Sequence, residues 1–342
     1  MLSKRLAILL AVAFLGASAR ADDTRSSLPA GGLVPTGPTS IQIESEEVEI
    51  TPRRISIHYV LRNPGDQDES PTIAFRLPDM DGMALCADTY RLPHRNEVNY
   101  MGFNVNSGGN PIPKQISVTA FHEGQDVTSR LAAAGITPNV LLQPLNAALA
   151  KIPPDQLQKL EDDGLIESHQ FENALIATGK RRGWCGQWTM RVEFTWTQPI
   201  AAHQAVDLTQ VYGPVAGGTT VAPTSDPSSY SGNYCAGSAN MDTIVKARAA
   251  AAEAKDKDDK TVPIVFYEQA IDFLLTSMKG WNGPIGTFHL SVVPLDPHDL
   301  VMTCTIGLER TAYGRYDLSR QNYLPGAELR LMILQRTKPL GW

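Results

Sequence analysis

The residues with the most distinctive chemistry in this sequence are four dispersed cysteines, Cys86, Cys185, Cys235 and Cys304. They form no C-x-x-C pair and lie near no clustered histidines, so their spacing argues against a zinc site. In an oxidising compartment, an even number of dispersed cysteines typically forms disulfides. Four cysteines allow three pairings, and the spacing alone leaves all three open.

Cys185 has an alternative interpretation, because the segment Gly183-Trp184-Cys185-Gly186-Gln187-Trp188 is similar to the surroundings of a cysteine protease nucleophile. Such an enzyme needs a histidine that holds the thiolate, and an asparagine or aspartate that orients the histidine. The seven histidines of this chain are scattered along the sequence. A disulfide cysteine beside a packed tryptophan explains the same segment, and we favour that interpretation.

Acidic residues are the second source of chemistry. Asp79, Asp81 and Glu309 are candidates for a hydrolase, but the sequence does not bring them together. Residues 66–69 and 79–82 supply two or three carboxylates each, whereas calcium takes six or more oxygen ligands. We therefore predict turns there. The sequence contains no G-x-S-x-G elbow, phosphate loop, H-E-x-x-H or EF-hand loop, so it indicates no catalytic residue, metal or cofactor.

The most distinctive loop is Trp281-Asn282-Gly283-Pro284, which continues into Ile285-Gly286. Glycine and proline set the backbone geometry of turns directly. We therefore favour a structural turn that leads into a strand at Phe288, with Trp281 buried as an anchor. The alternative is a rigid loop that presents an aromatic side chain to a ligand.

The elements that must position these residues are mostly β-strands. Apolar residues from Ile55 to Leu61 alternate with polar ones, which is typical of a strand with one buried face. The pattern slips earlier, so we expect a turn or bulge near Ser45. Further strands are predicted at 115–121, 190–196, 288–292, 301–306 and 329–333.

Between the β regions the apolar spacing changes to that of helices. Asp126 and Asn139 are predicted helix caps, and Pro153-Pro154 begins a third helix. The fold class is therefore mainly β (α+β overall), with two antiparallel β-sandwich-like regions and a small helical insertion. The predicted divisions are an N-terminal β-sandwich-like domain, the insertion and a C-terminal β-rich domain with one surface helix, at residues 22–125, 126–185 and 186–342.

The first 21 residues have the order of a secretory signal peptide. Lys4 and Arg5 precede an apolar run, and Ala19-Arg20-Ala21 provides a small-x-small cleavage site. The run has about a dozen residues, whereas a spanning helix needs about 20, so a retained anchor is the less favoured alternative. We therefore expect a periplasmic or secreted protein with no transmembrane segment after signal cleavage.

The charge distribution argues against nucleic-acid binding. The formal net charge is −6, and the only dense basic cluster is Lys180-Arg181-Arg182. A short basic run of this kind is usually a solvated loop.

Several segments together carry a family resemblance. They span most of the chain, in the order Ala30-Gly31-Gly32-Leu33, Ile43-Glu44-Ser45-Glu46-Glu47-Val48-Glu49-Ile50-Thr51-Pro52, Tyr59-Val60-Leu61-Arg62-Asn63, Ala74-Phe75-Arg76-Leu77-Pro78-Asp79-Met80, Thr195-Trp196-Thr197-Gln198, Trp281-Asn282-Gly283-Pro284-Ile285-Gly286 and Asn322-Tyr323-Leu324-Pro325. By these segments the chain resembles a bacterial secreted family known as domain of unknown function 4424. It departs from the family pattern at Pro199-Ile200-Ala201, and at Gln210-Val211-Tyr212-Gly213-Pro214, where members tend to have a histidine.

The resemblance implies an exported protein of Gram-negative bacteria and no particular activity. It also implies a pairing of the cysteines, with Cys235 joined to Cys304 and Cys86 joined to Cys185.

The favoured function is a non-enzymatic β-sandwich binding or scaffold module that recognises an unknown protein or a surface glycan. One alternative is a periplasmic hydrolase that acts on envelope polymers. Another is a structural component that recruits an assembly partner through a strand edge.

Overall fold

The structure is a computed structural model that describes residues 27–171, 181–221, 226–253, 265–275, 280–326 and 328–336. The predicted signal peptide lies outside these ranges. Within them the chain forms three large β-sheets, one separate hairpin and six helices. No helix in the described ranges has both the length and the apolar character of a membrane span.

The largest sheet has eight strands. They are β3 (Gln42–Ile50), β4 (Ile55–Arg62), β7 (Asn104–Ser107), β8 (Asn110–Pro111), β14 (Ala205–Tyr212), β17 (Ile285–Val292), β19 (Glu309–Arg310) and β20 (Tyr316–Tyr323). Their spatial order is β19-β20-β17-β3-β4-β14-β7-β8. All neighbours are antiparallel except β3 and β17, which run parallel. The register of β3 against β4 shifts between Ile43 and Ser45, which confirms the predicted irregularity.

A five-stranded sheet packs on the inner face of the first. It contains β1 (Ala30–Gly31), β15 (Thr220–Val221), β16 (Phe266–Leu274), β18 (Leu300–Met302) and β21 (Glu328–Arg336). The order is β1-β16-β21-β18, and β15 pairs with β16.

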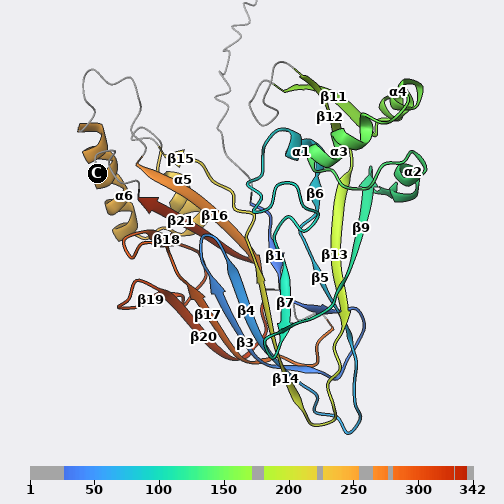
Figure 1. Cartoon of the computed structure of the whole chain (residues 1–342). Helices are drawn as coiled ribbons and strands as arrows, with labels where there is room; N and C mark the ends of the chain where they lie inside the picture. Colours follow the sequence, from blue (N-terminus) through green and yellow to red (C-terminus); the bar gives the residue numbers. More distant parts are fainter. Residues whose placement is uncertain are drawn as a thin grey trace, which may run out of the picture.

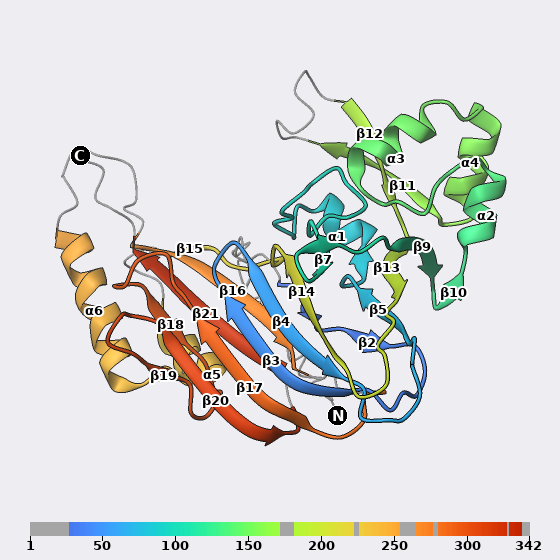
Figure 2. The same ribbon diagram turned by 60° about the horizontal axis from the view of Figure 1, so that its bottom comes forward.

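Alternation along β21 separates its two faces. Leu329, Leu331 and Ile333 belong to the main core, whereas Met332 and Leu334 belong to a second cluster. That second cluster is covered by α5 (Ser228–Tyr234) and α6 (Ser238–Glu253), through their buried side chains Tyr230 and Ile244. This half of the molecule therefore has three layers, with the helices outermost (Figure 2).

The third large sheet lies beside the first two and continues the same core. It contains β2 (Val34–Pro35), β5 (Thr72–Arg76), β6 (Met80–Asp81), β9 (Gln115–His122), β10 (Gln125–Asp126) and β13 (Thr189–Thr197). The order is β10-β9-β13-β5-β2, and β6 pairs with β13. Phe75 of β5 stacks on Phe103, just before β7, with ring centroids 4.0 Å apart, so aromatic packing joins this sheet to the eight-stranded one.

The helical insertion lies at the opposite end of the molecule from α6 (Figure 1). It contains α2 (Thr128–Ala133), α3 (Leu142–Leu149) and α4 (Pro154–Asp162), close to α1 (Gly82–Cys86). Asp126 Oδ1 accepts a hydrogen bond from Thr128 N at 2.8 Å and Asn139 Oδ1 accepts one from Leu141 N at 3.0 Å, but both residues lie before the cap positions. The N-caps are Val127 and Leu141, which form no side-chain cap hydrogen bond, so the two predicted caps are wrong in position. The hairpin of β11 (Ile166–Phe171) and β12 (Arg181–Gly186) was not predicted, since these strands lack apolar–polar alternation.

The mainly β fold class is confirmed, and its two β regions are interleaved. Each of the three large sheets combines strands from residues 22–125 with strands from residues 186–342. The parallel pairing of β3 with β17 is the clearest case, because those strands lie far apart in the chain. The sheets therefore do not follow the order of the sequence.

Candidate binding groove

An open groove lies between β20 and β21, at the side of the sandwich away from the helical insertion. Its volume is about 540 Å³. Leu275, Leu318 and Tyr323 contribute apolar lining, and Cys304 and Arg330 also line the groove. A cavity of this size is within the range of ligand sites in proteins.

Two strongly exposed apolar side chains also line this groove. Ile306 is 87% exposed and Leu324 is 68% exposed, although most large apolar side chains of the described chain are buried. Contiguous exposed apolar surface beside polar groups typically marks an interaction site. The groove and these two residues together are the best candidate for such a site.

One wall of the groove is an unpaired length of β21. Arg336 N donates a hydrogen bond to Asp299 Oδ1 at 3.2 Å, and Met332 pairs with Met302 of β18. The N–H and C=O groups of alternate residues in a strand point to the same side, so those of the even-numbered residues of β21 point toward β18. Arg330 has the same parity. No described backbone group pairs with its N–H or C=O on that side, because β18 ends at Met302.

A disulfide lies just beyond the end of β18. Cys304 would be the residue opposite Arg330 if the strand continued, but it is bonded to Cys235, with the two Cα atoms 5.0 Å apart. Cys235 ends α5 in the left-handed conformation, with a φ of 51°. The disulfide therefore ties Cys304 to the end of α5. The predicted strand 301–306 is shorter than expected, because β18 runs only from Leu300 to Met302.

The groove carries one arginine whose charge is not neutralised by a carboxylate. Arg330 forms an ion pair with Glu328 at 3.5 Å. Arg320 instead donates hydrogen bonds to the carbonyl oxygens of Ser319, at 3.0 Å, and Ile306, at 2.9 Å. It has no carboxylate partner among the described residues. The groove therefore favours a ligand with an acidic group.

A row of side chains runs inward from Arg320 across the eight-stranded sheet. Phe288 is its cross-strand neighbour on β17, Glu46 follows on β3, and Tyr59 follows on β4. Cross-strand neighbours share one face of a sheet. The rings of Phe288 and the groove residue Tyr323 are 4.8 Å apart. The row thus connects the groove to the interior of the sandwich.

Glu46 is the unusual member of this row. It is only 2% exposed, and its Oε2 has no hydrogen-bond partner. Burial raises the pKa of Glu46 to about 8, because the charged form is not solvated there. The carboxyl group is therefore largely neutral at pH 7. Gln210 lies on the same inner face, and its Oε1 is also buried without a partner.

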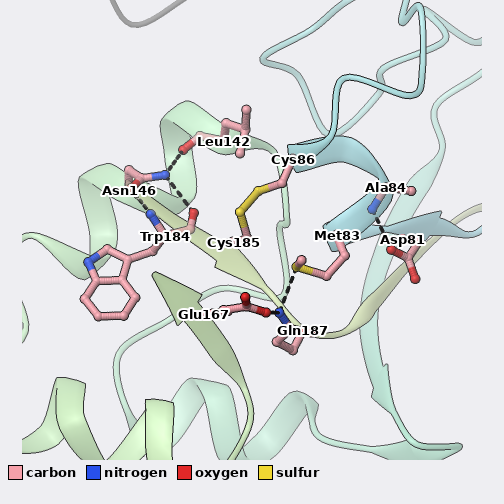
Figure 3. Close-up of a disulfide and its surroundings, with 10 residues drawn as sticks. All are labelled: Asp81, Met83, Ala84, Cys86, Leu142, Asn146, Glu167, Trp184, Cys185 and Gln187. Carbon is pink, nitrogen blue, oxygen red and sulfur yellow. Dashed lines mark hydrogen bonds between the residues drawn. A yellow bond between two sulfur atoms is a disulfide. The ribbon is translucent and has the colours of Figure 1, made fainter. Parts of the chain in front are cut away.

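The second disulfide, Cys86–Cys185, joins α1 to β12 beside the insertion (Figure 3), and both of its cysteines are buried. The Asn146 amide accepts a hydrogen bond from Trp184 N at 2.8 Å and donates one to Trp184 O at 3.0 Å. Gln187 Nε2 donates to Glu167 Oε2 at 2.7 Å.

Both disulfides match the pairing implied by the family resemblance, and no cysteine is free. Cys185 therefore has no thiol, and the interpretation as a protease nucleophile is excluded.

Two of the candidate acidic residues form local ion pairs or hydrogen bonds. Asp79 pairs with Arg191 at 2.8 Å, and Asp81 Oδ1 caps α1 by accepting a hydrogen bond from Ala84 N at 2.8 Å. Glu309 belongs to β19 of the eight-stranded sheet, whereas Asp81 belongs to β6 of the six-stranded sheet and Asp79 directly precedes β6. Among the residues that the structure describes, no group of three or more histidine, cysteine or acidic side chains could hold a metal ion.

The acidic turn at 66–69 is used in the same way. Asp68 Oδ1 accepts a hydrogen bond from Ala202 N at 2.9 Å, and Glu69 Oε2 accepts one from Thr39 Oγ1 at 2.6 Å. Asp66 pairs with His203 at 2.9 Å. These contacts favour the structural interpretation of this segment.

The loop Trp281-Asn282-Gly283-Pro284 is tied to the chain before β3. Trp281 is buried, and its Nε1 donates a hydrogen bond to Leu33 O at 3.0 Å. Asn282 N donates to Ile41 O at 3.0 Å, and Gly283 has a φ of +83°. These contacts favour a structural turn over a loop that presents Trp281 to a ligand.

Sequence reasoning missed the groove residues. Glu46 carried a signal, because it shares the register of the apolar positions Val48 and Ile50 in β3. Arg320 and Arg330 carried none, since an arginine in a polar strand end is unremarkable. The groove itself depends on where two distant parts of the chain meet.

Comparisons with known proteins place the chain in a family. No curated protein matches it. A crystal structure of a candidate nutrient-binding protein from Legionella pneumophila has a TM-score of 0.43 and 12% identity, over 91% of this chain and 72% of that one. An M1 zinc metallopeptidase from Deinococcus radiodurans has a TM-score of 0.25 and 9% identity, over 88% of this chain and 43% of that one. Similarity this low carries no functional argument. The family model described as Domain of unknown function (DUF4424) matches residues 21–332, so the chain belongs to the DUF4424 family.

Proposed function

We propose that this protein is a non-enzymatic binding module of the periplasm or the cell exterior, which holds part of a partner in the groove between β20 and β21. The observation that carries the proposal is the groove itself, with its apolar lining, the exposed Ile306 and Leu324, and Arg320 without a carboxylate partner. Two disulfides support the location, because such bonds persist in oxidising compartments.

The chemistry of the groove favours a protein over a glycan as the partner. Apolar side chains form much of the lining, and apolar surface is the main source of affinity between proteins. The positive charge of Arg320 favours an acidic group on that partner over a basic one.

Site-specific photocrosslinking in living cells tests the proposal. A benzophenone amino acid at position 324 should give a discrete covalent adduct with an envelope protein, and Arg320→Glu in the same chain should reduce the yield about tenfold. The matched control is the same amino acid at Ile116, which is 49% exposed and lies on β9, away from the groove. Equal adducts at both positions, or none at position 324, would contradict a binding groove.

A further inference from the structure

We propose that the occupant of the groove is one extended polypeptide strand of a partner protein, which pairs with the backbone of β21 at Arg330. This inference rests on the proposed function and specifies how the partner binds. The guest strand takes the place next to β21 that the chain leaves open after Met302, so that it extends the five-stranded sheet.

The first argument is the state of the backbone. Leu334 and Met332 are paired with β18 on the groove side of β21. Arg330 lies two residues before Met332, so its N–H and C=O point to the same side. A free donor and a free acceptor at strand spacing are what an added strand recognises. An apolar small molecule would leave both groups without a partner.

The second argument is that the edge is held open by a covalent bond. Cys304 lines the groove opposite Arg330 but is fixed to Cys235 at the end of α5. On its other side, Arg320 donates a hydrogen bond to Ile306 O at 2.9 Å. These two attachments keep residues 303–306 away from β21, although the sequence favours a strand there. Exposed strand edges are usually covered or blocked in proteins, so an edge that is actively kept clear indicates a use.

The third argument is the chemistry on each side of the edge. The Arg330 side chain has the parity of Met332, so it lies on the face covered by α5, where Glu328 neutralises it. The opposite face of the edge meets Leu318 and Tyr323 of the groove. A guest strand with alternating apolar residues therefore buries one set of side chains, and an acidic residue of the guest pairs with Arg320.

The experiment uses the disulfide-intact protein and a displayed library of random ten-residue peptides. Selected peptides should alternate apolar and polar residues and include an acidic residue. The best peptide is then synthesised with N-methyl groups on either the odd or the even amides. Methylation of one set should weaken binding about tenfold or more, and methylation of the other set should change it little, because a strand edge uses every second amide.

Two protein variants separate the backbone from the side chain. Arg330→Pro removes the N–H that faces the groove and should weaken peptide binding about tenfold. Arg330→Ala keeps that N–H and should bind within about threefold of the wild type, because the side chain lies on the other face. Circular dichroism and thermal unfolding establish that both variants are folded. The methylated peptides test the same point without any protein variant.

The failure of this inference is distinguishable from that of the proposed function. Enrichment of no peptide, equal effects of both methylation patterns, or equal effects of the two Arg330 variants would overturn strand pairing. A position-324 adduct that persists alongside such a result would leave the binding groove intact. A dimer in size-exclusion chromatography that Arg330→Pro dissociates would also overturn the inference, because the occupant would then be a second copy of this chain.

Discussion

The two disulfides lie in contrasting surroundings. Cys86 and Cys185 are 9% and 0% exposed, and they join α1 to β12 in the neighbourhood of Asn146 and Gln187 (Figure 3). Cys235 and Cys304 are both exposed, and Cys304 lines an open groove. The first bond lies in a packed region, whereas we propose that the second holds a segment away from β21. A disulfide can therefore maintain an opening as well as a core.

The largest expected effect distinguishes the two bonds by stability. The sequence separations are 99 and 69 residues, so chain entropy alone predicts nearly equal losses of about 4 to 5 kcal/mol. We expect Cys86→Ala/Cys185→Ala to lose about 5 kcal/mol or more in urea unfolding, because packing around the buried bond is lost as well. Cys235→Ala/Cys304→Ala should lose less. A larger loss of stability for Cys235→Ala/Cys304→Ala than for Cys86→Ala/Cys185→Ala would contradict the contrast between the two disulfides.

The next effect concerns the core behind the groove. The pKa of Glu46 is raised from 4.5 in the unfolded chain to about 8 in the folded one, so the unfolded state releases its proton first as pH rises. The contribution of Glu46 to the free energy of unfolding is therefore fully present below pH 4.5, and it is lost as the pH rises to 8 and beyond. Glu46→Gln should remove this dependence and stabilise the protein above pH 8 by roughly 5 kcal/mol.

Urea unfolding at several pH values measures this effect. Glu47→Gln is the matched control, because Glu47 is the exposed neighbour of Glu46 on the same strand. It should leave the pH dependence of the wild type in place. A wild-type stability that does not fall between pH 5 and pH 8 relative to Glu46→Gln would contradict a neutral buried carboxyl group.

The smallest effect concerns the rate of reduction. Thiol–disulfide exchange requires access to a sulfur atom, so a mild dithiol should open Cys235–Cys304 at least about tenfold faster than Cys86–Cys185. Alkylation with a mass tag, followed by peptide mapping over time, measures both rates in one sample. Loss of selected-peptide binding in step with the faster reaction would sharpen the comparison, because the freed segment can then pair with β21. Reduction of both disulfides at the same rate would contradict the difference in their exposure.

Local features of the fold were readable from the sequence, because each depends on neighbouring residues. Alternation in β4, the irregularity near Ser45 and the helix start at Pro153-Pro154 are examples. Even the buried turn at Trp281 follows from glycine, proline and a large aromatic side chain in one short segment. The strand predicted at 301–306 shows where this reasoning ends, since β18 stops at Met302, two residues before a cysteine that is bonded to a distant part of the chain.

By itself, the sequence determined the mainly β class, the helical insertion and the family, since periodicity, capping residues and short motifs are local properties of the chain. Only the tertiary structure decided which strands share a sheet, that Glu46 is buried beside Phe288, and that a groove opens between β20 and β21. The physical reason is that burial and strand pairing depend on segments that meet across long stretches of chain. An arginine becomes a candidate ligand contact only when folding places an open strand edge beside it.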